Sequence, residues 1–532
     1  MKYQAFLAMT LLVLFTPAAF AAISIPFTVT MSEAVNVTGC PANCPRIAVT
    51  VDGQTRYAQY SAGTGSSSLT FIYAPTIGDL DLDGVTLTSP IDLNGGTITD
   101  LNGNAITPLT YTVPDTSGIK IDYPSLSMDF VADADGRYTL NGTAYNDLSS
   151  FLGAAGGSFT RASVGTYYDA SGVLQTAASG TPRFDHDPVT HAAKGILIEE
   201  SRTNYFKNSA ALPSNTNLSP TLTSNIATDP MGGMNADQVA ASTTGSGVYG
   251  NSTNAALTAG TQYTISAYIK KISGVDTITF GVPNSFTNNT GDWTTRFDFS
   301  TNNFSSTNSN LSNPVVTNIG NNWVRLSVTA TLATGGTGGG PLIYSYGGAV
   351  TFLLWGSQIE AGAFPTSYIP TTNAVVTREA DILTIPTGTW YNQTAGTLFG
   401  FANSVVMNVD HRIATIRESA SDYFGLRITS SNLAQMVAYD SGGIKSITAA
   451  GALSAGNTKM VVTQQMNDVA LLYNGGTLVT GSAWSPVTAS YLAIGYDGVA
   501  PTLGFAFMNG YIKGIKYYPT RVSNTQLQLM TQ

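Results

Sequence analysis

Charged side chains are scarce in this 532-residue sequence. Asp, Glu, Lys and Arg together make up 10% of the chain, against about a quarter in an average globular protein. The balance is acidic, with a formal net charge of −9 at pH 7. Binding to nucleic acid, or simple attraction to anionic lipid, needs clustered Lys and Arg, so the composition argues against both functions.

Long apolar runs are absent beyond the first 21 residues. No later segment offers the roughly 18 uninterrupted apolar residues that a membrane-spanning helix needs. Residues 1–21 have the pattern of a secretory signal, with Lys2 as the positive end, an apolar stretch over residues 5–15 and a small-residue cleavage site at 19–21. We therefore expect an exported protein without a membrane span, located extracellularly, on the cell surface or in the periplasm.

Cysteine is also rare, and the two that occur are Cys40 and Cys44. They flank three residues in the turn-forming stretch CPANCP, and an exported protein enters an oxidising compartment. Two cysteines without a nearby histidine are too few for a structural zinc site. The spacing therefore predicts a small-loop disulfide.

Helical periodicity is nearly absent. Fifty-four glycines, frequent Thr, Ser and Asn, and short alternating runs indicate strands joined by turns. The clearest helix is a short C-terminal one, where Ser523 and Gln526 have the spacing of a capping box. The sequence predicts an all-β protein with several β-sandwiches in series, since 532 residues are too many for one core.

The first predicted domain covers residues 22–122. Alternation over residues 47–51, followed by Asp52-Gly53, predicts a β-hairpin. The stretches MSEAVNVTG, VDGQTRYAQYSAGTGSSSLTFIY and IDLNGGTITDLNGN resemble the bacterial immunoglobulin-like domains of surface adhesins. The resemblance implies a sandwich that serves as a spacer.

The same domain contains DLDLDG, in which Asp79, Asp81 and Asp83 match the first half of a calcium loop. Pro90 stands where an EF-hand needs a bidentate glutamate, so an EF-hand is excluded. Two interpretations stay open. One is a Ca²⁺ site completed by another loop, for which Asp100 is the candidate, and the other is a solvated acidic turn.

Residues 123–205 form a predicted connecting module. Arg-Ala-Ser at 161–163, Pro-Arg-Phe-Asp at 182–185 and the stretch GILIEESRTN at 195–204 resemble a module of bacteriophage tail and fibre proteins. In such proteins a jelly roll of the carbohydrate-binding type usually follows.

Residues 206–381 fit such a jelly roll. The stretch at 259–274, AGTQYTISAYIKKISG, alternates as a buried strand does, and residues 321–332 repeat the pattern. Residues 351–381 resemble the closing strand and exit of that family. The resemblance implies a β-sandwich that binds carbohydrate.

Residues 386–532 resemble the laminin-G and concanavalin A-like sandwiches. The pieces that carry the resemblance are GTLFGF, TKMVVTQQMNDVALLYNGG, YLAIGYDG and NGYIKGIKYYPTRVSNTQLQLM. The resemblance implies recognition of a glycan or of a protein, and the sequence does not separate these two ligands.

The sequence offers little catalytic equipment. Glycoside hydrolysis usually needs two carboxylates beside a sugar-sized cleft, yet the concanavalin-like segment holds one glutamate, Glu418. No Gly-x-Ser-x-Gly elbow is present. His186 lies between two aspartates in FDHDP, where a polar turn is favoured over an acid–base or metal site. We therefore predict no enzymatic activity and no catalytic residue.

Charge gathers in GILIEESRTNYF, which contains Glu199, Glu200 and Arg202. Adjacent residues of a strand point to opposite faces, so the two glutamates are a poor catalytic pair. Glu360 and Arg378 lie near the far end of the jelly roll. We predict that Glu199, Arg202, Glu360 and Arg378 form an ion-paired clamp where the chain enters and leaves that domain.

A glycan site pairs aromatic rings with amide or carboxylate side chains. The stretch NSFTNNTGDWTTRFDFSTNNF surrounds a tryptophan with amides and turn residues. The candidate ligand-binding residues are Trp293, Asp292, Phe286, Asn288, Asn289 and Tyr249 on the jelly roll, with Trp484 and Asp497 on the last domain. Half-buried packing or a solvated loop explains each of them equally well.

These observations predict an exported, non-catalytic, adhesin-like protein that binds a glycan or cell-surface polysaccharide through its lectin-like sandwiches. A surface protein is the other ligand class that stays open, and Ca²⁺ is the candidate cofactor. A phage-derived tail-fibre or receptor-binding protein is the first alternative, although a virion protein should lack a signal peptide. A polysaccharide depolymerase is the second, and the missing carboxylate pair counts against it.

Overall fold

Antiparallel sheets make up almost all of the regular structure. The computed structural model describes residues 24–131, 137–211, 219–250, 257–288, 290–404, 408–419, 422–440, 443–482, 485–498 and 506–532. Within these ranges the helices are α1 (Leu148–Ala155) and α2 (Asn524–Thr531), and neither is long enough to cross a membrane. The predicted all-β class is confirmed, whereas the predicted signal at 1–21 lies outside the described residues.

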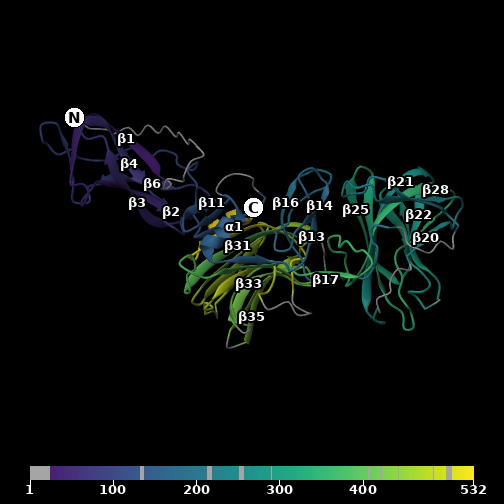
Figure 1. Ribbon diagram of the computed structural model, residues 1–532. Coiled ribbons are helices and arrows are strands. Elements are labelled where there is room, and N and C mark those ends of the chain that lie inside the picture. Colours follow the sequence, from purple (N-terminus) through teal and green to yellow (C-terminus); the bar gives the residue numbers. More distant parts are fainter. Residues whose placement is uncertain are drawn as a thin grey trace.

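Three bodies lie in a row (Figure 1). The N-terminal domain is at one end, a central sandwich carries the C-terminus, and the jelly roll is at the other end. The N-terminal sheet has the strand order β6-β2-β3-β4-β1-β7. Its strands are β1 (Ile25–Thr38), β2 (Arg46–Val51), β3 (Gln54–Ala62), β4 (Ser66–Tyr73), β6 (Thr86–Asp92) and β7 (Thr97–Asp100).

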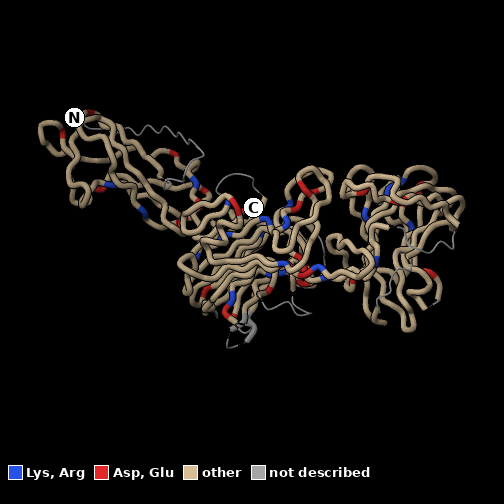
Figure 2. The backbone as a smooth tube through the Cα atoms, viewed as in Figure 1, with Lys and Arg blue, Asp and Glu red and all other residues tan. Residues whose placement is uncertain are grey.

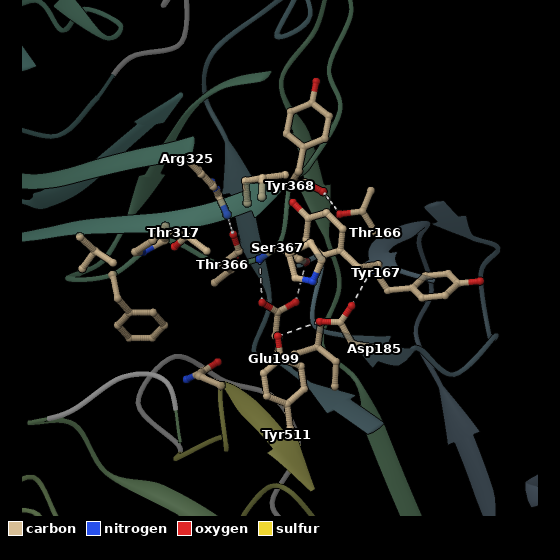
Figure 3. Close-up of a pocket in the computed structure, with 18 of the residues that line it drawn as sticks. Thr166, Tyr167, Asp185, Glu199, Thr317, Arg325, Thr366, Ser367, Tyr368 and Tyr511 are labelled. Atoms are coloured by element: carbon tan, nitrogen blue, oxygen red, sulfur yellow. Dashed lines mark hydrogen bonds between the residues drawn. The ribbon is translucent and has the colours of Figure 1, made fainter. Parts of the chain in front are cut away.

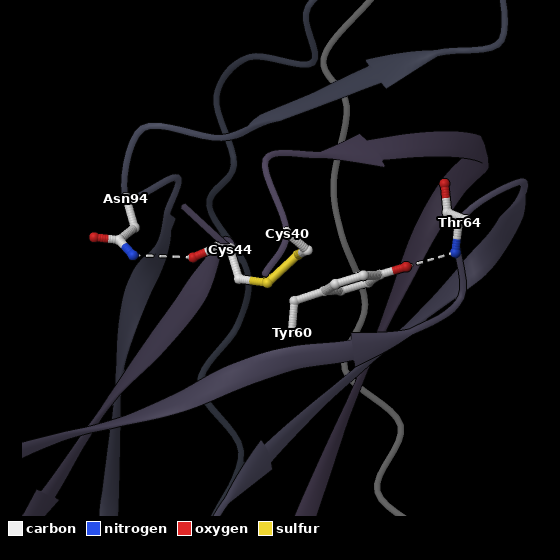
Figure 4. The surroundings of a disulfide bond; sticks show 5 residues. All are labelled: Cys40, Cys44, Tyr60, Thr64 and Asn94. Carbon is white, nitrogen blue, oxygen red and sulfur yellow. Dashed lines mark hydrogen bonds between the residues drawn. A yellow bond between two sulfur atoms is a disulfide. The ribbon is translucent and has the colours of Figure 1, made fainter. Parts of the chain in front are cut away.

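Two local features of the N-terminal domain match their predictions. Asp52 and Gly53 both have positive φ and join β2 to β3, the geometry of a tight hairpin turn. Cys40 and Cys44 form a disulfide with an S–S distance of 2.03 Å in the turn between β1 and β2 (Figure 4). Asn94 donates a hydrogen bond of 3.2 Å to the Cys44 carbonyl, which ties this turn to the β6–β7 loop.

The acidic loop of the N-terminal domain packs against the C-terminal end of the chain. Leu80 is 2% exposed in a cluster with Leu472 and Leu527. The Leu82 N–H donates to Gln526 Oε1 at 2.8 Å, and Gln526 Nε2 donates to Asp83 at 2.6 Å. Only half of the predicted capping box forms: Ser523 caps α2, but its own N–H donates to Asp52 and not to Gln526. The loop therefore docks the first domain onto α2.

The central sandwich contains two sheets around one apolar core. One sheet comprises β9 (Leu126–Asp129), β10 (Tyr138–Leu140), β11 (Thr143–Tyr145), β15 (Phe184–His186), β16 (Ala193–Ile198), β31 (Ala395–Ser404), β36 (Gly456–Gln465), β37 (Asp468–Tyr473), β38 (Val479–Gly481) and β40 (Gly510–Tyr518). The other comprises β12 (Ser158–Thr160), β30 (Ile382–Pro386), β32 (His411–Ser419), β33 (Asp422–Ile428), β34 (Leu433–Asp440), β35 (Gly443–Ala452) and β39 (Tyr491–Ile494).

The domain boundaries of this sandwich differ from the predicted ones. Strands from the segment 123–205 pair directly with strands from 386–532: β9 and β16 both pair with β40, and β12 pairs with β30. The supposed connecting module is therefore part of the C-terminal sandwich, and the jelly roll is an insertion into it. Local patterns reveal strands but do not show which strands far apart in the sequence pair.

The jelly roll consists of two sheets whose inner faces share a core. The six-stranded sheet comprises β18 (Thr221–Ala227), β19 (Ala236–Ala241), β28 (Val350–Ala361), β21 (Gln262–Gly274), β26 (Trp323–Thr331) and β25 (Leu311–Gly320). The five-stranded sheet comprises β20 (Gly247–Tyr249), β27 (Leu342–Ser345), β22 (Thr277–Val282), β23 (Trp293–Asp298) and β24 (Asn303–Thr307).

The chain enters and leaves the jelly roll at a two-stranded neck. This neck is formed by β17 (Arg202–Asn204) and β29 (Val376–Arg378), with Arg202 opposite Arg378. Two chain ends that are neighbours in an antiparallel ladder can be joined by a short turn. The central sandwich should therefore not need the inserted domain in order to close.

We predict that replacing residues 203–377 by a Gly-Ser-Gly turn leaves a chain that folds. The central sandwich keeps all of its strands in that variant, whereas the isolated fragment 386–532 loses β9, β10, β11, β12, β15, β16 and nearly all of β30, and exposes part of the core. Circular dichroism with thermal unfolding should show a cooperative β-sheet transition for the shortened chain and none for the fragment. Cooperative folding of the fragment alone would contradict the shared core.

Candidate functional site

Buried charges of both signs gather at the neck between the central sandwich and the jelly roll (Figure 2). Arg183 is fully buried and bridges two acids, with its Nη1 2.8 Å from Glu199 Oε2 and its Nη2 2.5 Å from Asp381 Oδ2. Arg161 Nη1 lies 2.9 Å from the other oxygen of Asp381. The ion cluster thus links the chain before the jelly roll to the chain after it.

Glu199 is held ionised by this cluster. Burial by itself would raise the pKa of its carboxyl, but Arg378 and Arg183 outweigh burial and lower the pKa to about 2. Ser367 adds two hydrogen bonds, from its N–H at 2.7 Å and from its hydroxyl at 2.6 Å. Since Ser367 belongs to the jelly roll, Glu199 fixes the inserted domain against the central sandwich.

The predicted clamp is only partly the observed one. Arg378 Nε lies 3.5 Å from Glu199, as a clamp requires. Arg202, however, pairs with Glu200 at 2.5 Å. Glu360 is fully buried but pairs with no described arginine, and it accepts hydrogen bonds from Gln358 Nε2 and from Thr366 instead. The prediction that Arg202 and Glu360 join the cluster is wrong because each is satisfied by nearer groups.

Sequence reasoning missed the other members of the cluster. Arg161 and Arg183 lie in the Arg-Ala-Ser and Pro-Arg-Phe-Asp motifs, and Asp381 follows the exit strand of the jelly roll. The signal that could have found them is an arginine inside each motif of a charge-poor chain. A buried arginine is nearly always paired with an acid, so each of these arginines called for a carboxylate partner.

A cavity of about 510 Å³ opens beside the ion cluster (Figure 3). Its floor is the outer face of β25, β26 and β21 in the jelly roll. One side is the loop 363–368, and another is the hairpin of β13 (Gly165–Tyr168) and β14 (Leu174–Ala177). The central sandwich supplies the facing wall with Asn509 and Tyr511. All three walls come from different parts of the chain.

The floor of the cavity presents a cation among polar and aromatic groups. Thr317, Arg325 and Tyr268 lie opposite one another on adjacent strands and so share one face of the sheet. Arg325 donates to the Thr366 carbonyl at 2.6 Å and to Ser266 Oγ at 2.9 Å. Both acceptors are neutral.

The wall formed by the central sandwich contains a second carboxylate. Asp185 is 3% exposed and accepts hydrogen bonds from the Tyr168 N–H and from the Tyr511 hydroxyl, the latter at 2.7 Å. Burial raises the pKa of Asp185 despite these bonds. Burial, together with Asp185 itself, raises the pKa of Tyr511 well above its ordinary value. Lys194 Nζ lies 5.0 Å from the centre of the Tyr511 ring.

The predicted ligand patch on the jelly roll does not form one surface. Phe286 is fully buried against Tyr263, so its proposed exposure is wrong. Trp293 is half-buried and packs against the core. Tyr249 follows the core residue Val248 on the same sheet and therefore points to the opposite face.

Three more of the predicted ligand residues, Asn288, Asp292 and Asp497, do not line the cavity. Asn288 and Asp292 are exposed, and Asp292 accepts a hydrogen bond of 2.8 Å from the Asn284 N–H, which shapes their loop. Asp497 is 7% exposed. Asn289 and Trp484 lie outside the described residues.

The four predicted calcium ligands are occupied by groups of the chain. Asp79 pairs with Arg56 at 2.9 Å, and Asp83 accepts from Gln526. Asp81 accepts from the N–H groups of Asp52 and Gly84, while Asp100 accepts from those of Asn102 and Asn104. Within the described ranges no group of three or more His, Cys, Asp or Glu side chains is arranged to hold a metal ion. Calcium binding stays a prediction of the sequence.

Comparison with known proteins assigns the chain to no family. No family model matches the sequence, and no curated protein matches it. Among solved structures, the CBM40 domain of the Ruminococcus gnavus IT-sialidase bound to α2,3-sialyllactose is similar, with 15% identity, a TM-score of 0.24, and 26% of this chain and 83% of that chain covered.

Two other solved structures are similar to the same degree. Domain 4 of an extracellular arabinanase from Geobacillus stearothermophilus, in complex with arabinotriose, has 11% identity and a TM-score of 0.24 over 32% of this chain and 84% of that chain. A structure of botulinum neurotoxin type C, whose cell entry depends on interaction with two ganglioside molecules, has 10% identity and a TM-score of 0.24. The match covers 29% of this chain and 40% of that chain. These similarities assign no ligand to this chain.

We predict that Glu199→Gln destabilises the protein by about 3–5 kcal/mol at pH 7, because it leaves buried arginines without their counter-charge. The folded pKa of Glu199 is about 2, below its ordinary value of 4.5. The stabilisation is therefore complete above about pH 4.5 and is lost as the pH falls toward 2. Denaturant unfolding should show the gap between wild type and variant shrinking over that interval.

The matched control is Glu379→Gln. Glu379 is exposed at the same neck, so its removal should change the free energy of unfolding by less than about 0.5 kcal/mol. If both variants unfold at the same denaturant concentration at pH 7, the cluster does not stabilise the neck.

Proposed function

We propose that this protein is an exported, non-catalytic recognition protein that binds glycan in the cavity at the junction of the jelly roll and the central sandwich. The observation that carries the proposal is the cavity itself. Its volume of about 510 Å³ lies within the range of about 300–1,000 Å³ that ligand pockets usually have. Export rests on the sequence pattern of residues 1–21.

The composition of the lining suits a sugar. A sugar ring has an apolar C–H face, which packs on aromatic rings, and a rim of hydroxyls, which needs hydrogen-bonding partners. Phe364 and Tyr511 contribute rings. Thr317 and Asn408, whose side chains carry a hydroxyl and an amide, line the same space. Both sets of contacts are therefore present around one cavity.

The two carboxylates of the cavity support binding rather than hydrolysis. A glycosidase needs one carboxyl group to act as an acid and another to act as a nucleophile or base. Glu199 already accepts two hydrogen bonds from Ser367 and pairs with Arg183 and Arg378. Both oxygens of Asp185 also accept hydrogen bonds. Each of the two carboxylates is thus already held by groups of the chain.

The proposal is tested by a glycan array on the chain from residue 22 onward and on its Thr317→Trp variant. Thr317 is exposed on β25 and lines the cavity, so an indole there should fill the space without disturbing the core. We expect the wild type to bind selected glycans and the variant to bind them about tenfold more weakly or worse, a loss of about 1.4 kcal/mol.

The matched control is Ser312→Trp, an exposed position on the same strand that does not line the cavity. It should bind as the wild type does. Binding that both tryptophan variants retain would move the site away from the cavity, and an absence of binding to any glycan would refute the proposed function. A parallel array in EDTA tests the calcium prediction.

A further inference from the structure

The junction carries an excess of positive charge in an acidic protein. Around the ion cluster and the cavity, five cationic side chains face four carboxylates, which leaves one positive charge over. The cations are Arg161, Arg183, Lys194, Arg325 and Arg378, and the carboxylates are Asp185, Asp187, Glu199 and Asp381. The whole chain has a formal net charge of −9.

Arg325 carries the uncompensated charge. It forms no ion pair with any described carboxylate, and its two hydrogen bonds go to the Thr366 carbonyl and the Ser266 hydroxyl. A guanidinium has five N–H donors, so most of them have no acceptor here. Arg325 lies on the floor of the cavity, where it is shielded from much of the solvent.

Lys194 is a second cation at the cavity, and it is only weakly paired. Its ion pair with Asp187 is long, with an N···O distance of 3.9 Å, and its side chain is 26% exposed. The ammonium group lies 5.0 Å from the centre of the Tyr511 ring, on the wall that faces the jelly roll. Two cations therefore border the cavity from two different bodies of the molecule.

Glu199 and Asp185 do not neutralise these two cations. Glu199 is already paired with Arg183 and Arg378. Asp185 is engaged by the Tyr511 hydroxyl, and burial disfavours its charged form. An anion that entered the cavity would meet Arg325 without displacing a carboxylate, and it would meet Lys194 beside the long ion pair with Asp187.

We propose that the ligand of this cavity is an acidic saccharide, in which a sugar carboxylate lies between Lys194 and Arg325. The inference rests on the proposed function and adds the class of glycan. A planar guanidinium matches carboxylate geometry, and a charge-assisted hydrogen bond is stronger than a neutral one. The carboxylate supplies the counter-charge that the chain does not, while the sugar ring packs on Phe364 and Tyr511.

The test compares carboxylate-bearing glycans with their methyl esters, which keep the sugar backbone and lose the charge. Glycans that bind on the array are titrated by calorimetry as the acid and as the ester, with trigalacturonic acid and its methyl ester as a defined pair. We expect the acidic form of the bound glycan to bind about tenfold more tightly or better than its ester.

Three variants separate the cavity charges from general electrostatics. Lys194→Met and Arg325→Gln should each remove most of the preference for the acid over the ester. Lys120→Met lowers the net charge of the protein by the same amount, but Lys120 is exposed in the N-terminal domain and should leave the preference unchanged. Lys194→Met keeps the test decisive if Arg325→Gln fails to fold, because Lys194 is partly exposed.

The outcomes distinguish the two proposals. Equal binding of acid and ester, or binding confined to neutral glycans, overturns the acidic class and leaves glycan recognition standing. A preference for the acid that Lys194→Met does not alter places the carboxylate elsewhere and overturns the assignment to this cavity. Binding to no glycan of either kind refutes the proposed function itself.

Discussion

The buried ion cluster at the neck is the interaction on which the rest of the structure depends. Removing charges from water is expensive, and a buried pair is tolerated only when its geometry is good and its remaining donors and acceptors are satisfied. Arg183 meets the geometric part of this condition by bridging Glu199 and Asp381, which lie before and after the jelly roll, while its Nε has no hydrogen-bond partner among the described residues. The jelly roll therefore has a fixed orientation on the central sandwich, and the cavity between them has a fixed shape.

The cluster also explains why the charge concentrated around Glu199 is structural. A catalytic carboxylate needs an oxygen available to the substrate, but every strong partner of Glu199 belongs to the chain: two arginines and both donors of Ser367. A low pKa at this position reports tight internal pairing. Perturbed pKa values occur at functional sites and in structural ion networks alike, and the saturation of the oxygens separates the two cases.

Local features of this fold could be predicted from sequence, and long-range ones could not. The Asp52-Gly53 hairpin, the Cys40–Cys44 disulfide and the cap at Ser523 are each set by residues a few positions apart, and all are present. The pairing of β9 with β40 joins strands almost 400 residues apart, and nothing in either strand specifies its partner. The insertion of one sandwich into another was therefore invisible.

The candidate site was missed for the same reason. Aromatic residues among amides, such as Phe286 and Trp293, were expected to face solvent, but a sandwich of this size uses such rings to fill its core. The cavity instead takes Lys194 from the central sandwich and Arg325 from the jelly roll. Neither residue stands out in the sequence, because what distinguishes them is their pairing in space: Lys194 has only a long ion pair with Asp187, and Arg325 has none with a described carboxylate.

Because the jelly roll is an insertion, it is connected to the central sandwich twice, and this limits its movement. A domain attached by one linker moves relative to its neighbour unless their interface is large and apolar. The jelly roll is attached by two adjacent strands, β17 and β29, and is fixed by buried charge on both sides of them. Two cations on separate bodies can then be held at a constant separation around a cavity lined by aromatic and polar side chains. A binding site formed at this junction is preorganised by the same charges that hold the domains together.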